Sequence, residues 1–325
     1  MVLAFLELDQ GEISETSLQM LRLAGDIANQ MNTRVQAVLV GGEGRAESGG
    51  LSAYGFSELH LIENKELADY APDAWAHGLL QLMEELQPKA LIAAGSDRGN
   101  ELLARVAVRG ELPMAANCIA ASVDGVVVRV TRVRWGGSLM EEAVLHGSPA
   151  LLTVMPHMLK PIASVPNGSE PTVTRFQVTL SRDDLRVRVV TRESAAEGVS
   201  LNNAAVVVSG GRGVGSAEGF EVLEKLARQI GAAVGCSRAV TNNGWRPHSD
   251  QVGQTGAQIS PQLYIACGIS GAIQHMSGCR GSKNILVVNT DPEAPILQRA
   301  DYAVIGDLHE VLPALSDEID KLARR

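Results

Sequence analysis

The chain has 325 residues, of which 45% are hydrophobic and 20% charged, a globular composition with enough length for two domains. Its formal net charge of −9 excludes nonspecific nucleic-acid binding, which needs a basic surface. No apolar run approaches the ~20 residues that a membrane-spanning helix requires, and the first residues show no signal-peptide pattern. We therefore expect a cytoplasmic protein with no nucleic-acid partner and no direct membrane insertion.

The first half of the chain alternates short apolar segments with segments of helical periodicity. The pattern predicts strands over 2–8, 35–40, 59–62 and 90–94, helices over 14–31 and 75–86, and a further helix that begins near Asn100. The uninterrupted apolar run 90–94 is typical of a parallel strand covered on both faces. This alternation predicts an α/β domain with a doubly wound, mostly parallel sheet.

After this point the helices stop and short strands follow one another. The pattern predicts strands over 117–121, 126–134, 142–146 and 150–154, which we interpret as an antiparallel extension of the sheet. Two more strands are predicted over 173–180 and 185–190. The polar, small-residue segment 192–203 offers few core contacts, so it predicts a boundary between an N-terminal domain, 1–193, and a C-terminal domain, 194–325.

The second domain opens with an apolar strand, 204–208, then the glycine turn SGGRGVG and a helix predicted over 216–230. Because the first amides of a helix are unpaired and its dipole is positive there, this arrangement predicts an anion site with Arg212 inside the turn. The glycine spacing matches neither G-x-G-x-x-G nor a P-loop, so a purely structural turn fits equally well. The next strand leads into Ser237 and Arg238, at the strand end where α/β sheets bind ligands. A surface ion pair is the alternative for Arg238.

Three further turns carry side chains that can hydrogen-bond a flat, polar ligand. They are QVGQTG with Thr255, GISGAIQH with Ser270 and His275, and NTDPEAP with Asn289 and Asp291. Thr255 could instead close its own turn, His275 could cap a helix, and turn chemistry is the preferred role for Asp291. Taken together, the turns predict a site for a large cofactor that carries phosphate.

The cysteines and histidines predict no metal site. The four cysteines, Cys118, Cys236, Cys267 and Cys279, form no CxxC pair, and the seven histidines show no HxxxH spacing. We expect buried free thiols, because free cysteine is among the most buried residue types.

Five segments, in order and at family spacing, closely resemble the C-terminal half of the electron transfer flavoprotein α subunit. They are SGGRGVGSAEGF, GCSRAV, QVGQTG, PQLYIACGISGAIQH and NTDPEAPILQRADYAVIGDL. The resemblance runs from Ala204 to about Pro313, whereas the N-terminal half agrees only in its α/β rhythm and size. It implies FAD bound in extended form by the second domain, at an interface with a smaller β subunit. Cys267 departs from the family, which usually has valine or another small apolar residue there.

The resemblance also implies roles for individual residues. Arg212 would contact the pyrophosphate, Ser237 and Arg238 would lie against the isoalloxazine ring, and Thr255 would donate toward N5. His275 would lie near O2, and the adenosine end would be held by Asn289, Asp307 and Leu308. The expected FAD-binding residues are Arg212, Ser237, Arg238, Gln251, Val252, Gly253, Gln254, Thr255, Ser270, Gly271, Ala272, Ile273, Gln274, His275, Asn289, Asp307 and Leu308. A guanidinium and an imidazole near N1 and O2 would stabilise an anionic semiquinone electrostatically, so Arg238, Thr255 and His275 are expected to tune the flavin.

The function implied is that of an electron carrier with no catalytic residue of its own. It would form a heterodimer with the β subunit and accept electrons from flavin dehydrogenases of the acyl-CoA dehydrogenase type, as in fatty acid oxidation. It would pass them to an oxidoreductase such as a membrane quinone reductase. The second domain would swivel about 192–203, and an apolar patch on the first would contact the β subunit. The alternatives are a bifurcating complex with a second FAD in the β subunit, a stand-alone flavin oxidoreductase, and an adenine-nucleotide binding module.

Overall fold

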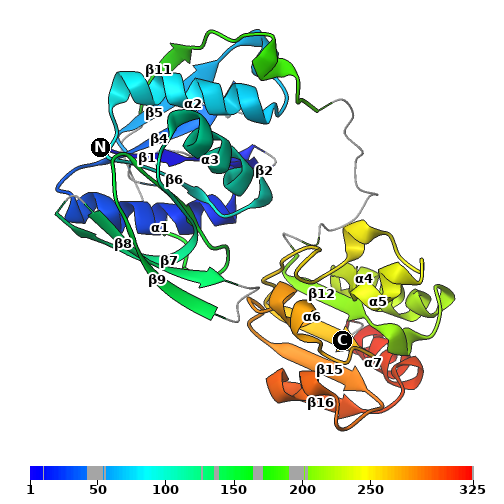
Figure 1. Ribbon diagram of the computed structural model, residues 1–325. Helices are drawn as coiled ribbons and strands as arrows, with labels where there is room; N and C mark the ends of the chain where they lie inside the picture. Colours follow the sequence, from blue (N-terminus) through cyan, green and yellow to red (C-terminus); the bar gives the residue numbers. More distant parts are fainter. Residues whose placement is uncertain are drawn as a thin grey trace. The chain divides into compact units, whose positions relative to one another are not determined.

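The computed structural model describes residues 1–9, 11–41, 54, 56–125, 127–134, 139–163, 171–189, 201 and 204–323 (Figure 1). The chain divides into two compact units, Met1–Arg192 and Glu193–Arg325, each with its own core. The boundary expected between 193 and 194 lies beside this division. Of the segment 192–203, on which we placed a hinge, all residues except Leu201 lie outside the described part.

The described residues of the first unit contain a mostly parallel sheet in the order β11-β5-β4-β1-β6-β10-β7-β8-β9. Its strands are β1 (Val2–Phe5), β4 (Val35–Val40), β5 (Glu58–Glu63), β6 (Ala90–Ala94), β7 (Met114–Asp124), β8 (Val127–Arg134), β9 (Leu139–Leu145), β10 (Ala150–Val154) and β11 (Thr172–Gln177). The pairs from β11 to β7 are parallel, and β7, β8 and β9 form an antiparallel meander. A small hairpin of β2 (Leu8–Asp9) and β3 (Glu12–Ile13) follows β1.

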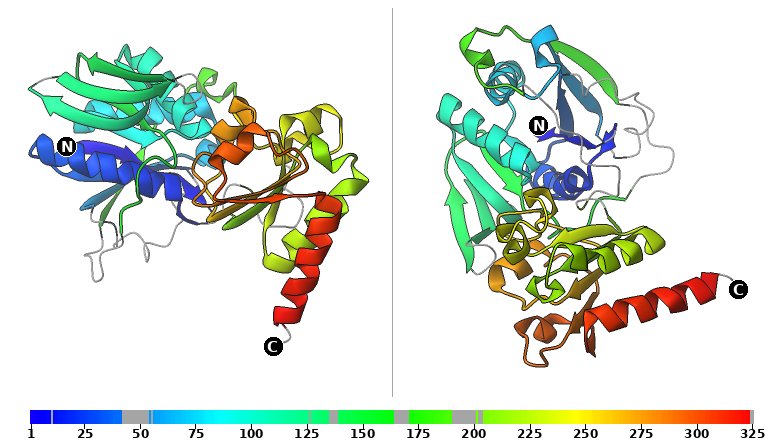
Figure 2. Two further views of the ribbon diagram at one scale, coloured as in Figure 1. Left: turned by 90° about the horizontal axis from the view of Figure 1, so that it is seen from below. Right: turned by 90° about the vertical axis from the view of Figure 1, so that its right-hand side faces the viewer.

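Helices cover both faces of this sheet, which confirms the doubly wound architecture (Figure 2). On one face α1 (Glu15–Gln30) shares a core with the inner face of the meander. On the other, α2 (Pro72–Leu86) and α3 (Asp97–Gly110) pack over the central strands. Serine N-caps fix the starts of α1 and α3, because the side chains of Ser14 and Ser96 accept hydrogen bonds from the amides of Ser17 and Gly99.

Two sequence predictions for this unit are wrong. Residues 150–154 do not belong to the antiparallel extension, because β10 is a fully buried strand that pairs parallel with β6 and with β7. A long connection through the meander brings the chain back to the sheet centre, which local periodicity cannot reveal. Residues 185–189 form no strand, since Asp183–Leu185 is a 3-10 turn pulled toward the helices by Asp184.

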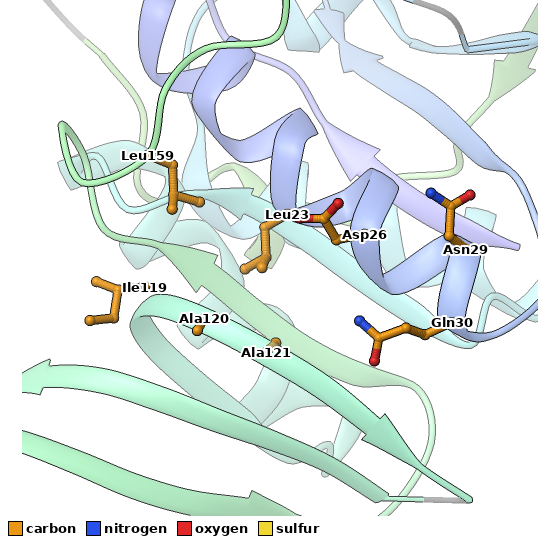
Figure 3. A pocket seen from close by; sticks show the side chains of 8 residues that line it. All are labelled: Leu23, Asp26, Asn29, Gln30, Ile119, Ala120, Ala121 and Leu159. Carbon is orange, nitrogen blue, oxygen red and sulfur yellow. The ribbon is translucent and has the colours of Figure 1, made fainter.

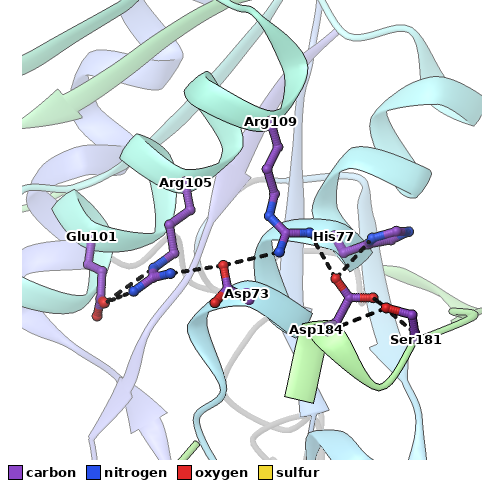
Figure 4. A network of polar contacts seen from close by, with 7 residues as sticks. All are labelled: Asp73, His77, Glu101, Arg105, Arg109, Ser181 and Asp184. Atoms are coloured by element: carbon purple, nitrogen blue, oxygen red, sulfur yellow. Dashed lines mark hydrogen bonds and ion pairs between the residues drawn. The ribbon is translucent and has the colours of Figure 1, made fainter. Parts of the chain in front are cut away.

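A polar network fastens this turn to α2 and α3 (Figure 4). Arg109 of α3 pairs with Asp184 at 2.8 Å and with Asp73 of α2 at 3.1 Å, and His77 Nδ1 lies 3.3 Å from Asp184. Ser181 donates to the same carboxylate through its amide and its hydroxyl, at 2.9 and 2.7 Å. Burial alone would raise the pKa of Asp184, but the hydrogen bonds from Ser181 and Arg109 and the nearby His77 outweigh it and lower the pKa to about 2.

Asp184→Asn should therefore lower the free energy of unfolding by on the order of 2 kcal/mol. The pKa of Asp184 is lowered in the folded state from 3.8 to about 2, so the contribution is complete above about pH 4 and is lost as pH falls toward 2. Chemical denaturation at several pH values measures it. Asp183→Asn is the matched control, because Asp183 is exposed and pairs only with exposed Arg186 in the described residues. An equal decrease in the free energy of unfolding in both variants would contradict the role of Asp184 in anchoring the turn.

The described residues of the second unit form a parallel sheet in the order β13-β12-β14-β15-β16. The strands are β12 (Val206–Gly210), β13 (Ala233–Cys236), β14 (Leu263–Cys267), β15 (Ile285–Asn289) and β16 (Tyr302–Ile305). On one face pack α4 (Glu221–Ile230) and α7 (Leu308–Ala323), with the short helix α5 (Arg238–Asn242) at its border. The other face is covered by α6 (Ile273–Gly278) and the segments around Ile259 and Ile296. Within the described ranges, every helix is too short or too polar to cross a membrane.

The prediction of a helix beginning at Ser216 is wrong. Two 3-10 turns, Arg212–Val214 and Glu218–Phe220, come before α4, which begins at Glu221. Phe220 is buried and fills the space above Gly210, where an added Cβ would lie 2.6 Å from its ring. The start of α4 is thus displaced along the chain from Arg212, and the glycine turn does not feed directly into a helix N-terminus.

Candidate functional site

A cavity of about 500 Å³ lies at the carboxyl ends of β12, β13, β14 and β15 in the second unit. This is the edge at which parallel sheets bind ligands, because the loops that follow each strand converge there. Its lining residues are Arg212, Gly213, Ser237, Arg238, Ala239, Gln251, Val252, Gly253, Gln254, Thr255, Gly268, Ile269, Ser270, Gly271, Ala272, Gln274, His275, Asn289, Asp291 and Ala294.

The cavity gathers all of the expected site residues except Ile273, Asp307 and Leu308. Ile273 is exposed, whereas Leu308 is buried in the core. Asp307 Oδ1 accepts from the His309 amide at 2.9 Å, so this carboxylate caps the start of α7. The lining residues that sequence reasoning missed are Gly213, Ala239, Gly268, Ile269 and Ala294, which are neighbours of motif residues and carry little chemical signal. Asp291, for which a turn role was preferred, also lies in the lining.

Glycines allow the loops after β12 and β14 to touch through their backbones. Gly213 N donates to Gly268 O at 3.0 Å, and Gly211 N donates to Cys267 O at 2.8 Å. A Cβ on Gly213 would lie 2.7 Å from the Gly268 Cα, which no side chain tolerates. The contact places Arg212 beside the loop 268–275.

The cavity contains two cations without internal partners. Arg212 and Arg238 are exposed, and neither makes an ion pair or a side-chain hydrogen bond with any described residue. The ion-pair alternative for Arg238 is therefore not observed in the described part of the chain. Nearby, the backbone amides of Ser270 to Gln274 make no hydrogen bond within the described residues. Guanidinium groups and unpaired amides are donors only, so they suit an anionic or carbonyl-rich ligand.

The turn after Gln251 is organised by side-chain hydrogen bonds. Gln251 is buried, and its Nε2 donates to Thr255 Oγ1 at 2.9 Å while its Oε1 accepts from the Thr241 hydroxyl at 2.7 Å. Because the oxygen of Thr255 accepts from Gln251, its hydrogen remains available to a ligand.

Two other polar residues of the cavity mainly hold loops in place. Asn289 is buried, donates to Ile269 O at 3.0 Å and accepts from the Asp291 amide at 3.2 Å, so it ties the loops after β14 and β15 together. Asp291 accepts from the Glu293 amide at 2.9 Å, which is the turn chemistry expected for it. It also lines the cavity.

His275 is buried, and its Nε2 lies 2.7 Å from the Tyr264 hydroxyl. Burial lowers the pKa of His275 to about 4, which a backbone group of Val252 opposes only in part. The ring is therefore neutral near pH 7. It can offer an N–H dipole to a ligand, but not the positive charge that Arg238 can supply.

The thiols lie in the core, as expected. All four cysteines are free and buried. Cys267 packs in the core shared by α4 and α7, and burial raises the pKa of its thiol to about 12. Among the described residues there is no group of three His, Cys, Asp or Glu side chains that could hold a metal ion.

A second cavity, of about 420 Å³, lies in the first unit between α1 and β7 (Figure 3). Leu23, Ile119, Ala120, Ala121 and Leu159 give it an apolar floor, and Asp26, Asn29 and Gln30 of α1 stand at its rim. Its lining has no cation and no histidine, so it lacks the anion-binding chemistry of the first cavity.

The fold and the cavity define an α/β protein with a donor-rich cavity at its sheet edge, a lining that suits a nucleotide-type cofactor. Comparison with known families specifies the class. Residues 200–280 match the electron transfer flavoprotein FAD-binding domain, and residues 2–181 match the electron transfer flavoprotein domain. The chain belongs to the electron transfer flavoprotein family, as an α subunit, and its cofactor is FAD.

Individual relatives match over nearly the whole chain. Electron transfer flavoprotein subunit alpha of Thermoanaerobacterium thermosaccharolyticum is 34% identical, with 98% of this chain and 97% of the relative covered. Protein FixB of Clostridium saccharobutylicum is 36% identical, with 97% and 94% covered. Electron transfer flavoprotein subunit alpha of Bacillus subtilis is 33% identical, with 97% and 96% covered. The guanidiniums and amides of the cavity, which have no partner among the residues that the structure describes, fit the pyrophosphate and the ring carbonyls of FAD.

Gly271→Ala should weaken FAD binding at least about tenfold, which corresponds to about 1.4 kcal/mol. Gly271 has φ +88°, and an added Cβ would lie 2.6 Å from the backbone nitrogen of Ile296, so the loop must move. Fluorescence titration of the apoprotein with FAD measures the change. Gly244→Ala is the control, because Gly244 also has a positive φ, +70°, but has open space around its Cβ position. Equal affinities of the two variants would show that the contact with Ile296 is unimportant.

Proposed function

We propose that this chain is the FAD-bearing subunit of a two-subunit electron carrier. It would take electrons from flavin dehydrogenases, including the acyl-CoA dehydrogenase type, and deliver them to an acceptor such as a quinone-reducing oxidoreductase. The observation that carries the proposal is that one cavity contains a neutral, buried imidazole and two guanidiniums that have no partner among the described residues. FAD supplies one-electron chemistry when bound, and the protein supplies position and electrostatics.

Each residue then has a distinct task. Arg212, in the turn after β12, would hold the pyrophosphate in fork geometry. Arg238, which begins α5, would place its charge against the electron-accepting ring and favour added negative charge there. Thr255, with its hydrogen free, would donate to a ring nitrogen without supplying a proton rapidly.

The stand-alone oxidoreductase is less well supported. Such an enzyme needs a general acid or base held over the ring, commonly a histidine oriented by a carboxylate. Within the described lining the only carboxylate is Asp291, which accepts from a turn amide, and His275 pairs with Tyr264 instead. The chain thus offers ring-tuning groups without a substrate-converting pair.

The partner subunit has a candidate contact surface in the first unit. Leu139, Met140 and Val144 of β9 are exposed, at the outer edge of the meander. Exposed apolar side chains on an edge strand commonly mark an interface or an aggregation site. We propose that the β subunit covers them.

Arg238→Gln should lower the first one-electron potential of the bound flavin by on the order of 60 mV, a tenfold change in the equilibrium. The reason is the loss of a positive charge beside the ring. Anaerobic reductive titration of the α/β complex, followed by absorbance, measures both one-electron steps. Arg228→Gln is the control, because Arg228 is exposed on α4 and does not line the cavity.

The same titration separates the alternatives. One flavin with two resolved one-electron steps supports the carrier, whereas two flavins with well-separated potentials indicate the bifurcating form. A chain purified with AMP or ATP and no flavin absorbance would overturn the proposal in favour of an adenine-nucleotide binding module. Turnover of a substrate by the isolated chain would identify an oxidoreductase.

A further inference from the structure

Tyr264 lies in the middle of the second unit, on β14 and directly behind the cofactor cavity. Its side chain is fully buried, and its hydroxyl is 2.7 Å from Nε2 of His275. The two rings are tilted at 38° with centroids 6.1 Å apart, so the contact is made by the hydroxyl and not by stacking. Tyr264 itself does not line the cavity.

The direction of this hydrogen bond follows from the surroundings. Burial raises the pKa of Tyr264 well above 10, so the phenol keeps its proton. The ring of His275 is neutral near pH 7, and a neutral imidazole has one donor nitrogen and one acceptor nitrogen. Ser209, on neighbouring β12, lies near enough to the Tyr264 oxygen to lower the pKa of Tyr264 slightly, although its hydroxyl makes no hydrogen bond of standard geometry with a described residue. The Tyr264 hydrogen is therefore directed to Nε2.

Nearby ionisable groups do not alter this arrangement. Cys236, Cys267 and Cys279 lie near Tyr264, and burial raises the pKa of each to about 12, so they remain neutral thiols. The other ring nitrogen of His275, Nδ1, is buried and has no hydrogen bond of standard geometry among the described residues. The backbone of Val252 nevertheless lies close enough to the ring to favour a donated N–H, because it raises the pKa of His275.

We propose that Tyr264 is a positioning residue that holds His275 as the Nδ1–H tautomer by donating to Nε2, so that Nδ1–H is directed at the backbone carbonyl of Val252, a residue that lines the cavity. The inference rests on the proposed FAD site for the effect on cofactor binding, but not for the tautomer. It assigns His275 a fixed dipole in place of a mobile charge. A histidine with a free choice of tautomer would offer a donor only part of the time.

The test is ¹⁵N NMR of the full-length chain with labelled histidine, with and without FAD, from pH 6 to pH 9. The signal of His275 is assigned by its loss in His275→Gln. We expect one tautomer, protonated at Nδ1, over the whole range. In Tyr264→Phe, which keeps the aromatic ring in the core, we expect a mixture of tautomers and an FAD dissociation constant raised about tenfold.

Tyr302→Phe is the matched control, because Tyr302 is exposed on β16, in the same unit and outside the cavity. It should leave both measurements unchanged. A wild-type ring protonated at Nε2, or the same single tautomer in Tyr264→Phe, would overturn the proposal. A chain that shows the expected tautomers but binds no FAD would leave the positioning role intact and remove the proposed function, so the two failures are distinguishable.

Discussion

The backbone contact between Gly213 and Gly268 is the constraint on which the site depends. It joins the loops after β12 and β14, where the strand order of the second unit reverses direction along the sheet. Because neither loop has a side chain at the contact, Arg212 and the segment that leads to His275 are brought to one edge of the sheet. Parallel strands supply the edge, and glycine supplies the close approach.

In this site, two arginines carry positive charge and a neutral histidine acts only through hydrogen bonds. Arg212 and Arg238 are cations in contact with solvent, so they can meet a negatively charged cofactor without first losing a partner in the described part of the chain. His275, which also lines the cavity, is buried and neutral, since burial opposes its protonation. A carrier that must hold added negative charge needs both features, because charge sets the potential while fixed dipoles set the orientation.

The first unit contributes a stable frame in which one edge strand, β9, exposes apolar side chains. Its core on both faces of the sheet is continuous, and the network around Asp184 holds the last described turn against α2 and α3. The meander, by contrast, ends in β9, an edge strand with exposed apolar side chains. The turn after β11 is held by ion pairs, and β9, at the other edge of the sheet, exposes apolar side chains. Both features are consistent with a unit to which the proposed partner subunit binds.

The sequence by itself determined the alternation of strands and helices, the buried free thiols and the turns that carry Arg212, Arg238, Thr255 and His275. These features depend on local periodicity and on residue types that have few structural substitutes. Tertiary structure alone decided that 150–154 is a central parallel strand, that 185–189 forms no strand and that α4 starts late. Each depends on a partner that is distant in the sequence: 150–154 pairs with β6, the turn before 185–189 is held by Arg109, and Phe220 fills the space above Gly210. The contact of Tyr264 with His275 could also be found only in the fold, because the apolar sequence of β14 does not predict which side chain the Tyr264 hydroxyl contacts.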